Sequence, residues 1–381
     1  MGDVAIIGAG VHGASAAFHL TSRGADVTVF ETTRPAGGPT GRSSAVCRAY
    51  YTNRFLAEAA RESLDMFADW ADAVGGDAGF RHTGALFLHG AEDRRQVEDA
   101  TAILNSIGTA CDLLDVTYLR RRFPMFDTDG IALAVLERGA GYADPASTTD
   151  ALFQAAVERG AKARLGCRVE RVEPRDEGGA FLHVSDGSRS PFERVLIAAG
   201  PWTRPLSAQA GFDLPLTVER HPVVTFAWGG AERVIMHADI PSGYYFRPEG
   251  SQLFLMGPLH AEPEADPDRF SERIAEDERD DLSARLVHRI PSMAAAQVQG
   301  GWASLYDVSP DWQPVIGEIA PGIFVDAGTS GHGFKLAPGL GRHVAAMVLG
   351  DDVPGLEEFS ARRFQEHRAL AAGYGQARIL G

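Results

Sequence analysis

Asp3-Val-Ala-Ile-Ile-Gly8-Ala-Gly10-Val-His-Gly13 opens the chain with a short apolar run followed by three spaced glycines. The run predicts a buried parallel strand, because it is short, rich in β-branched residues and ended by glycine. From Gly13 to Arg23 the small and apolar residues have helical spacing, and Gly24 is expected to end the helix. Val27–Phe30 predicts a second strand, with Glu31 at its carboxyl end. The opening of the chain therefore predicts a complete βαβ unit.

The three glycines form the G-x-G-x-x-G pattern between a strand and a helix. The first allows a tight turn, the second lets the backbone approach a pyrophosphate, and the third lets the helix pack closely on the strand. A carboxylate about 20 residues further on is placed to bond ribose hydroxyls, and its charge disfavours a 2′-phosphate. The His12 side chain is expected to point outward into solvent rather than to act in catalysis. The residues expected at the dinucleotide are Gly8, Gly10, Val11, His12, Gly13 and Glu31.

The path of the chain after this unit favours FAD over NAD. A free-standing NAD dehydrogenase usually completes its sheet with successive βα units. Here the chain leaves the sheet after Glu31 for a loop rich in Gly, Arg and Ser, residues 37–48, and returns to parallel strands much later. We therefore expect a tightly held FAD that is reached by several distant segments, with a nicotinamide-dependent dehydrogenase as the alternative of another class.

Composition limits the class of protein. The chain has 381 residues, of which 45% are apolar and 23% charged, as in ordinary globular proteins. Its net charge of −15 argues against nucleic acid or anionic membrane as a partner. Cys47, Cys111 and Cys167 are widely spaced and odd in number, which indicates neither a disulfide framework nor a zinc site. No basic segment precedes the first strand, and no apolar run approaches the roughly 18 residues of a membrane span. We therefore expect a soluble cytoplasmic protein.

Two styles of strand predict two domains. Parallel-strand patterns recur at Val195–Ala199 and Ile323–Asp326, whereas short alternating runs between Leu216 and Trp302 predict antiparallel strands. The fold class expected is mixed α/β, with a Rossmann-like FAD-binding domain and an inserted, mainly antiparallel substrate domain. The FAD-binding domain is assigned residues 1–80, 141–215 and 303–381, and the substrate domain residues 81–140 and 216–302. Other predicted elements are helices at Leu56–Trp70, Glu92–Ile107, Ala146–Arg159, Asp268–His288 and Pro338–Leu349, and strands at Gly84–Leu88, Ala163–Val172 and Leu182–Ser185.

Further motifs follow in a fixed order along nearly the whole chain. They are Gly41-Arg-Ser-Ser-Ala-Val-Cys-Arg48, Ala198-Ala-Gly-Pro-Trp-Thr203, Gly243-Tyr-Tyr-Phe-Arg-Pro248, Leu305-Tyr-Asp-Val-Ser-Pro-Asp311, Pro314-Val-Ile-Gly317 and Gly328-Thr-Ser-Gly-His-Gly-Phe-Lys-Leu-Ala-Pro338. Together with the fingerprint, this series resembles the D-amino-acid oxidase and sarcosine oxidase superfamily of FAD-dependent amine oxidoreductases. The resemblance is greatest to its sarcosine oxidase and dimethylglycine/proline dehydrogenase members.

The resemblance implies a set of site residues. Arg48 and Lys335 are expected to hold the substrate carboxylate, as a guanidinium and an ammonium can by charge-assisted bonds. Only one of Tyr244 and Tyr245 can face the pocket from a strand, and Tyr245 is expected there. His332 is expected to touch the flavin or the amine, with a supporting role as the alternative. Tyr51 is a weaker candidate for the same wall. The remaining residues expected at the flavin are Arg42, Ser43, Ser44, Val169, Ala199, Gly200, Trp202, Gly331, Gly333, Phe334 and Lys335 itself.

The sequence departs from the sarcosine oxidase pattern in two places. Ser304 stands where monomeric sarcosine oxidases carry a cysteine bonded to FAD, so non-covalent FAD is expected. The strand Leu253–Met256 lacks the lysine that promotes the reaction with oxygen. A positive charge stabilises superoxide forming beside reduced flavin. Its absence favours a dehydrogenase over an oxidase.

These features predict an FAD-dependent oxidoreductase that acts on CH–NH or CH–NH2 groups (EC 1.5 or 1.4). The expected reaction oxidises the C–N bond of a small amino acid, either sarcosine or another N-methyl amino acid, or one like proline. Hydride passes to flavin N5, and the imine product is hydrolysed. The expected partners are this small molecule and an electron acceptor, either oxygen or another carrier. One alternative is a D-amino-acid dehydrogenase or oxidase of the same superfamily. Another is a non-catalytic flavin-binding subunit, but the presence of Arg48 and Lys335 argues against it.

Overall fold

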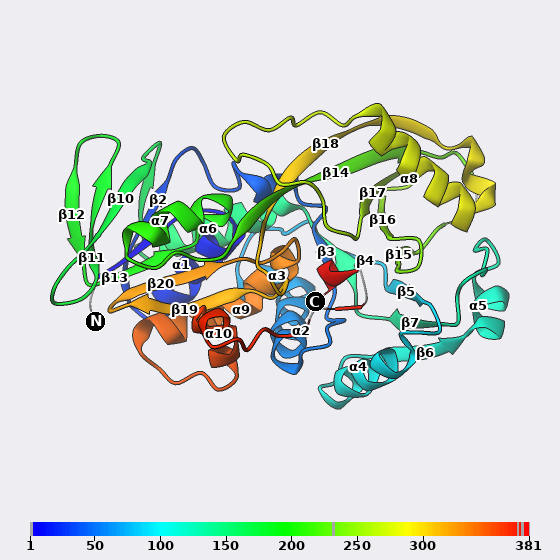
Figure 1. Cartoon of the computed structure of the whole chain (residues 1–381), viewed down its shortest axis with the longest axis horizontal. Coiled ribbons are helices and arrows are strands. Elements are labelled where there is room, and N and C mark those ends of the chain that lie inside the picture. Colours follow the sequence, from blue (N-terminus) through cyan, green and yellow to red (C-terminus); the bar gives the residue numbers. More distant parts are fainter. Residues whose placement is uncertain (1–2, 231–232, 372, 375–376, 381) are drawn as a thin grey trace.

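A computed structural model of the chain describes residues 3–230, 233–371, 373–374 and 377–380. Two large sheets lie toward opposite ends of the long axis (Figure 1). The first has six strands in the order β19-β20-β13-β1-β2-β9, all parallel to their neighbours except β19 against β20. Its strands are β1 (Asp3–Ile7), β2 (Asp26–Glu31), β9 (Lys162–Leu165), β13 (Arg194–Ile197), β19 (Val315–Ala320) and β20 (Ile323–Ala327).

Strand β1 is buried on both faces of this sheet. Val4 and Ile6 belong to one apolar cluster, whereas Ala5 and Ile7 belong to another on the opposite side. This arrangement requires the continuous apolar run seen in the sequence, because successive side chains point to opposite faces. On one side α1 (Val11–Ser22) packs between α6 (Pro145–Glu158) and α9 (Gly333–Leu349), and on the other α7 (Thr203–Gln209) covers β13 and β20. The predicted βαβ unit is therefore confirmed.

The second sheet has eight strands in the order β18-β14-β17-β16-β15-β5-β7-β6. All pairs are antiparallel except β15 with β5. The mixed α/β fold with a mainly antiparallel second sheet is thus confirmed. The strands are β5 (Ala85–His89), β6 (Cys111–Asp115), β7 (Leu133–Glu137), β14 (Thr217–Ala227), β15 (Met236–Asp239), β16 (Tyr244–Glu249), β17 (Leu253–Pro258) and β18 (Gln297–Val308), and the helices beside them are α4 (Arg94–Ser106), α5 (Val116–Arg122) and α8 (Glu276–Arg289).

Two small sheets complete the fold. One joins β3 (Val46–Cys47), β4 (Arg81–His82) and β8 (Gly141–Tyr142), and lies between the large sheets (Figure 1). The other joins β10 (Val169–Pro174), β11 (Ala180–Val184) and β12 (Arg189–Phe192). The domain boundaries stay a prediction, and β18 runs across the one at residue 303. The remaining helices are α2 (Arg54–Ala68), α3 (Trp70–Ala73) and α10 (Arg362–Gln365), with 3-10 turns at Pro39–Arg42, Gly200–Trp202, Pro291–Ala295, Leu356–Phe359 and Arg378–Leu380.

The structure corrects three element boundaries: those of the strand 163–172, the helix 268–288 and the helix α9. The predicted strand Ala163–Val172 is two strands, β9 and β10, in different sheets. Gly166 between them has φ +68°, a conformation that favours glycine and turns the chain. The predicted helix Asp268–His288 begins only at Glu276, because the Arg220 guanidinium donates to the carbonyls of Ser271 and Arg273 and holds that segment non-helical.

Helix α9 begins five residues before the predicted start at Pro338. A proline inside a helix leaves a backbone carbonyl without its N–H partner. Here that carbonyl belongs to Phe334, in the first turn. Side chains of neighbouring helices bond the backbone on either side of the proline: Ser15 Oγ donates to the Ala337 carbonyl (2.7 Å), and Ser63 Oγ donates to the Leu336 carbonyl (3.0 Å) and accepts the N–H of Gly339 (2.9 Å). The helix therefore tolerates Pro338, and Lys335 lies in its buried first turn.

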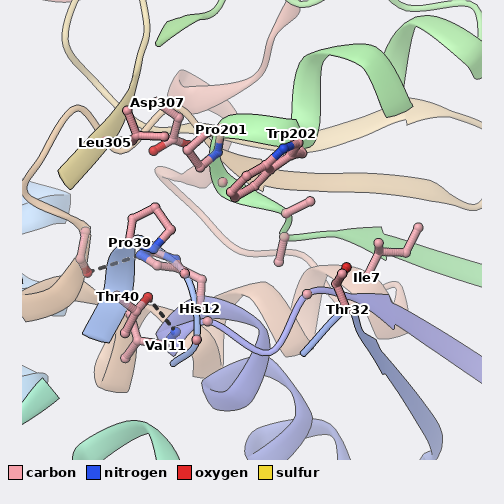
Figure 2. Close-up of a pocket in the computed structure, with 18 of the residues that line it drawn as sticks. Ile7, Val11, His12, Thr32, Pro39, Thr40, Pro201, Trp202, Leu305 and Asp307 are labelled. Carbon is pink, nitrogen blue, oxygen red and sulfur yellow. Dashed lines mark hydrogen bonds between the residues drawn. The ribbon is translucent and has the colours of Figure 1, made fainter. Parts of the chain in front are cut away.

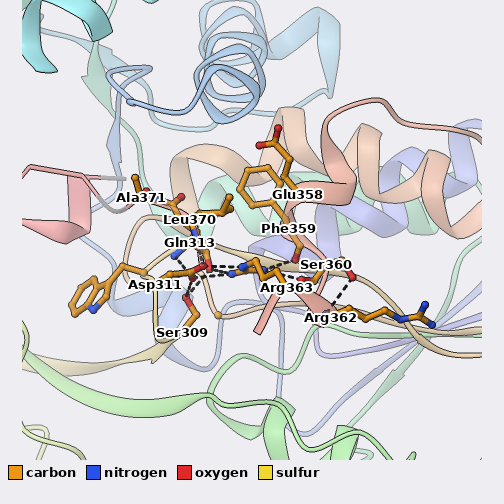
Figure 3. Close-up of polar contacts among 12 residues, drawn as sticks. Ser309, Asp311, Gln313, Glu358, Phe359, Ser360, Arg362, Arg363, Leu370 and Ala371 are labelled. Atoms are coloured by element: carbon orange, nitrogen blue, oxygen red, sulfur yellow. Dashed lines mark hydrogen bonds and ion pairs between the residues drawn. The ribbon is translucent and has the colours of Figure 1, made fainter. Parts of the chain in front are cut away.

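A buried ion pair anchors the last segment of the chain. Figure 3 shows Arg363 on α10 directed at Asp311 and Gln313. Its guanidinium donates to both oxygens of Asp311 (2.8 and 2.9 Å) and to the Gln313 carbonyl (3.0 Å). Asp311 also accepts the N–H of Leu370 (3.0 Å). Both charges are almost fully buried and hydrogen-bonded, so loss of either would leave the other uncompensated.

We predict that Arg363→Ala lowers the free energy of unfolding by about 3–5 kcal/mol, because it leaves a buried carboxylate unpaired. Arg362→Ala is the matched control, since its side chain is exposed, and should change stability by less than about 0.5 kcal/mol. Urea unfolding followed by circular dichroism measures both. Equal losses in the two variants would contradict a specific role for the buried pair.

Candidate active site

A cavity of about 690 Å³ lies beside the carboxyl ends of β1, β2 and β13. This is where open parallel sheets bind ligands, and the volume is in the range of small-molecule sites. Figure 2 shows Pro201 and Trp202 on one side of the cavity and Val11, His12 and Thr40 on the other. Segments far apart in sequence therefore line one cavity.

The glycines of the fingerprint fit a dinucleotide. A Cβ at Gly13 would lie 2.0 Å from the Gly8 carbonyl oxygen, and a Cβ at Gly8, whose φ is +106°, would lie 2.5 Å from that of Ala198. Only glycine permits this approach of strand, turn and helix. Gly13 thus lets the helix pack against the turn and does not line the cavity, whereas Gly8 and Gly10 do. Thr40 Oγ1 accepts the N–H of Val11 (3.2 Å), which joins the next loop to the first turn of α1 (Figure 2).

Glu31 lies at the cavity edge with its carboxylate fixed by the backbone. Its Oε2 accepts the N–H of Ala9 (2.9 Å), and its Oε1 accepts the N–H of Thr33 (2.8 Å). An ionised carboxylate has about four acceptor positions, so positions remain for hydroxyl donors. Glu31 therefore both shapes the fingerprint turn and fits a ribose.

The Gly/Arg/Ser loop also lines the cavity, with Arg42, Ser43 and Ser44. Arg42 donates to the Gly37 and Gly38 carbonyls (3.3 Å each) and to Glu272 (2.6 Å). Its guanidinium thus joins the loop to the segment between β17 and α8. The other predicted flavin residues that line the cavity are Val169, Ala199, Gly200, Trp202, Gly331, Gly333 and Phe334.

A second, smaller cavity of about 60 Å³ adjoins the first. Ser44, Tyr306 and Gly331 line both cavities, so these residues mark the boundary between them. Arg48, Tyr245 and Lys335 line only the smaller one. The structure therefore brings three of the four predicted catalytic residues together. Lys335 lies at this cavity and not at the larger one, to which it had also been assigned.

Arg48 is buried and already hydrogen-bonded. Its guanidinium donates to the carbonyls of Tyr50, Ile379 and Leu380, the last two at 3.3 and 3.0 Å. It also lies over the Tyr51 ring, 4.7 Å from the centroid. Ile379 and Leu380 line the cavity themselves. Sequence reasoning missed these two, because main-chain carbonyls at a site carry no sequence signal.

The smaller cavity is electropositive. Burial, and then the charge of Arg48, lowers the pKa of Lys335 well below its ordinary value. Glu137 lies nearby but is engaged elsewhere: it accepts the N–H groups of Ala49 (2.7 Å) and Tyr50 (3.1 Å), and burial raises its pKa to about 7. Glu137 thus fixes the backbone next to Arg48 without lining the cavity, and sequence reasoning missed it too.

Tyr244 and Tyr245 point to opposite faces of β16, as strand geometry requires. Tyr245 lines the cavity, as predicted. The Tyr244 hydroxyl bonds His237 Nε2 (3.1 Å) in the core of the second sheet. Only Tyr245 is therefore available to a ligand.

His332 and Tyr51 do not lie where the sequence placed them. His332 Nε2 donates to the Trp312 carbonyl (2.9 Å), and the Tyr51 hydroxyl meets His332 Nδ1 (3.2 Å). Burial, and then the charge of Lys335, lowers the pKa of His332 to about 3. Neither side chain is among the residues that line the two cavities. The geometry favours the supporting role for His332 and places Tyr51 under Arg48.

The prediction that His12 points into solvent is wrong. His12 lines the larger cavity, its side chain is only 13% exposed, and Nδ1 lies 2.9 Å from Asp326 Oδ2. Asp326, at the end of β20, was not identified from sequence, because its partner lies more than 300 positions away. His221 and Tyr306, whose rings stack with centroids 3.9 Å apart, are further cavity residues that sequence reasoning missed.

Within the described part of the chain, no helix is long and apolar enough to cross a membrane. The same residues include no group of three or more His, Cys, Asp or Glu side chains placed to bind a metal ion.

The chain is similar to proteins of known activity. A family model described as "FAD dependent oxidoreductase" (DAO) matches residues 3–347. The chain is 26% identical to 4-methylaminobutanoate oxidase (formaldehyde-forming) of Paenarthrobacter nicotinovorans, over 95% of this chain and 46% of that protein. It is also 26% identical to N-methyl-L-tryptophan oxidase of Yersinia pestis (strain Pestoides F), over 95% and 99%. The chain thus spans less than half of the first relative.

The fold is shared with solved structures. L-proline dehydrogenase from P. horikoshii superposes with a TM-score of 0.86 at 23% identity, covering 97% of this chain and 99% of that one. Glycine oxidase from Geobacillus kaustophilus superposes with a TM-score of 0.81 at 24% identity, covering 95% and 98%. At these identities the likeness shows a common fold.

We predict that Glu31→Ala weakens FAD binding about 10- to 100-fold, as for loss of hydrogen bonds to a charged group. It should not change which substrates reduce the flavin, because Glu31 lines only the larger cavity. Flavin fluorescence titration of the apoprotein measures the affinity. Glu158→Ala, at an exposed position on α6, is the matched control. A Glu31 variant with full affinity would contradict the ribose assignment.

Proposed function

This chain belongs to the DAO family of FAD dependent oxidoreductases, and from that premise we propose that it oxidises the C–N bond of a small amino acid. The preferred substrates are N-methylated or proline-like. The nicotinamide-dependent alternative is set aside, because the family is defined by FAD. The larger cavity is assigned to FAD and the smaller one to the substrate.

One observation supports the substrate class: two basic side chains share a small buried cavity whose described lining holds no carboxylate. Among the described residues that line it, none is Asp or Glu. Buried charges are normally paired, and an isolated one is costly. A substrate carboxylate would supply the missing negative charge, offset the lowered pKa of Lys335, and bond the planar Arg48 fork.

The side chains of the smaller cavity then hold the substrate. Bound FAD supplies the two-electron acceptor for the C–N bond. Arg48 and Lys335 bind the carboxylate, which places the amine end toward Ser44, Tyr306 and Gly331, where the two cavities adjoin. The Tyr245 hydroxyl is available for a hydrogen bond to the substrate. Positioning of this kind is a large part of what a protein contributes to such a reaction.

The contacts of Arg48 limit the size of the substrate. The carbonyls of Ile379 and Leu380 occupy one edge of its guanidinium, so an incoming carboxylate must share or displace them. Phe87, Phe246 and Leu259 make the rest of the wall apolar. A compact amino acid with a small apolar side chain suits this space. The same clamp serves either enantiomer, so D-amino acids remain the alternative substrates within this proposal.

The FAD is proposed to be non-covalent. Ser304 lies in β18, lines the larger cavity, and cannot form the thioether that a cysteine forms. Acid precipitation of the purified protein should therefore leave the yellow colour in the supernatant. Colour in the protein pellet would show a covalent bond and overturn this assignment.

We predict that Arg48→Lys and Lys335→Met each cost about 2–5 kcal/mol in transition-state binding for an amino acid, as for a buried charge pair that loses a partner. The same variants should change little for the matching amine that lacks the carboxylate. Rapid-mixing measurement of flavin reduction with both substrates, and with both enantiomers of the amino acid, isolates the coupling.

Lys162→Met is the matched control for these variants, because Lys162 lies exposed at the edge of the first sheet. It should leave both rates unchanged. If Arg48→Lys and Lys335→Met slow the amino acid and the amine equally, the two residues act on the flavin or the fold and the carboxylate clamp is wrong.

A further inference from the structure

His12 lies between two hydrogen-bond acceptors. Its Nδ1 is 2.9 Å from the Asp326 carboxylate, and its Nε2 is 3.1 Å from the Gly333 carbonyl oxygen. A neutral imidazole has one N–H and one lone pair, so it satisfies only one of two acceptors. One additional proton, shared between His12 and Asp326, satisfies both contacts, because Nε2–H can then donate to Gly333 while a second hydrogen bridges Nδ1 and the carboxylate. The geometry by itself therefore points to a protonated pair.

The pair joins the two segments that build the flavin site. His12 is the second residue of α1, directly after the fingerprint turn, whereas Gly333 is the first residue of α9, two positions before Lys335. The contact is close: a Cβ at Gly333 would lie 2.7 Å from His12 Nε2. Gly333 lines the larger cavity and Lys335 lines the smaller one, so a change at His12 would alter the shape of both.

Asp326 has a second oxygen that faces no donor. Within the described part of the protein, Oδ1 is buried and has no hydrogen-bond partner, although Asp326 lines the larger cavity. Buried polar atoms are nearly always paired in native proteins. A hydroxyl of the bound cofactor would supply the donor. Because His12 bonds Oδ2, it also fixes the direction in which Oδ1 points.

We propose that His12 is a positioning residue, and that its protonated contact with Asp326 and Gly333 is a latch that holds the fingerprint turn against the start of α9, which makes FAD affinity depend on pH. This role is distinct from the carboxylate clamp and rests only on the assignment of the larger cavity to FAD. It also assigns Asp326 to the cofactor site.

The charges around the ring set the direction of the effect. Burial lowers the pKa of His12, but Asp326, and then Asp307 and the Gly333 carbonyl, raise it above the ordinary 6.5 overall. His332, on the loop before α9, stays neutral and adds no repulsion. A raised pKa means that the latch is complete below pH 6.5 and is lost as the pH rises through the folded value. The negative diphosphate at the N-terminus of α1 would favour the proton further.

The test compares FAD binding by the wild-type apoprotein and by Asp326→Asn. The pH runs from about 6.5, the ordinary pKa of histidine, to about 9, because the pKa of His12 is raised. An asparagine amide donates to Nδ1, so the neutral ring can still donate to Gly333 and every contact survives without the extra proton. The wild-type Kd should rise about tenfold over this range, because FAD binds more tightly to the protonated pair. The Asp326→Asn Kd should change less than about twofold.

A second measurement counts the protons directly. Nitrogen NMR of histidine-labelled apoprotein, with the His12 signals assigned by their loss in His12→Gln, should show both ring nitrogens protonated at neutral pH in the wild type and only one in Asp326→Asn. An equal pH dependence of Kd in the two proteins, or a neutral His12 in the wild type, would overturn the latch. Failure of the wild type to bind FAD at any pH would instead overturn the cofactor assignment, and the NMR count would still decide the state of His12.

Discussion

The close contact between the first strand and the first helix is the constraint on which the site depends. A Cβ at Gly13 would lie only 2.0 Å from the Gly8 carbonyl oxygen. Any side chain there would therefore force the helix away from the strand. The N-terminus of α1 would then no longer lie at the strand ends where Glu31 and Ala199 line the same cavity. Several distant segments are packed against this one turn, including the Thr40 loop, the 198–202 turn and the start of α9. A single steric requirement therefore fixes the shape of the cofactor site.

The second determinant is an imbalance of charge. The protein carries a net charge of −15, yet it buries Arg48 and Lys335 together at a cavity whose described lining has no carboxylate. Two other buried arginines are each paired with a carboxylate, Arg363 with Asp311 and Arg289 with Asp239. The contrast matters because a buried charge without a partner is costly, and an anionic ligand would supply that partner. Beside Arg48, Glu137 accepts the N–H groups of Ala49 and Tyr50 and so fixes the course of the backbone there.

Local pattern was sufficient where one interaction type dominates. The apolar run of β1, the glycine spacing and the alternation in β16 each follow from backbone geometry, and all three are seen in the structure. Prediction was wrong where a distant side chain changes the local preference. Pro338 lies inside α9, where Ser15 and Ser63 from neighbouring helices bond the backbone on either side of it. The 268–275 segment is not helical because Arg220 donates to its carbonyls.

The sequence by itself determined the βαβ unit, the family, the mixed α/β class and the residue types at the site. These depend on periodicity, on glycine stereochemistry and on motif order, which are properties of neighbours along the chain. Only the tertiary structure decided that Lys335 faces the smaller cavity, that His332 turns into the core, and that His12 meets Asp326. The reason is physical: the direction of a side chain and the charge it carries depend on which atoms surround it. Those atoms come from other segments of the chain, 20 positions away for His332 and Trp312 and 314 positions away for His12 and Asp326.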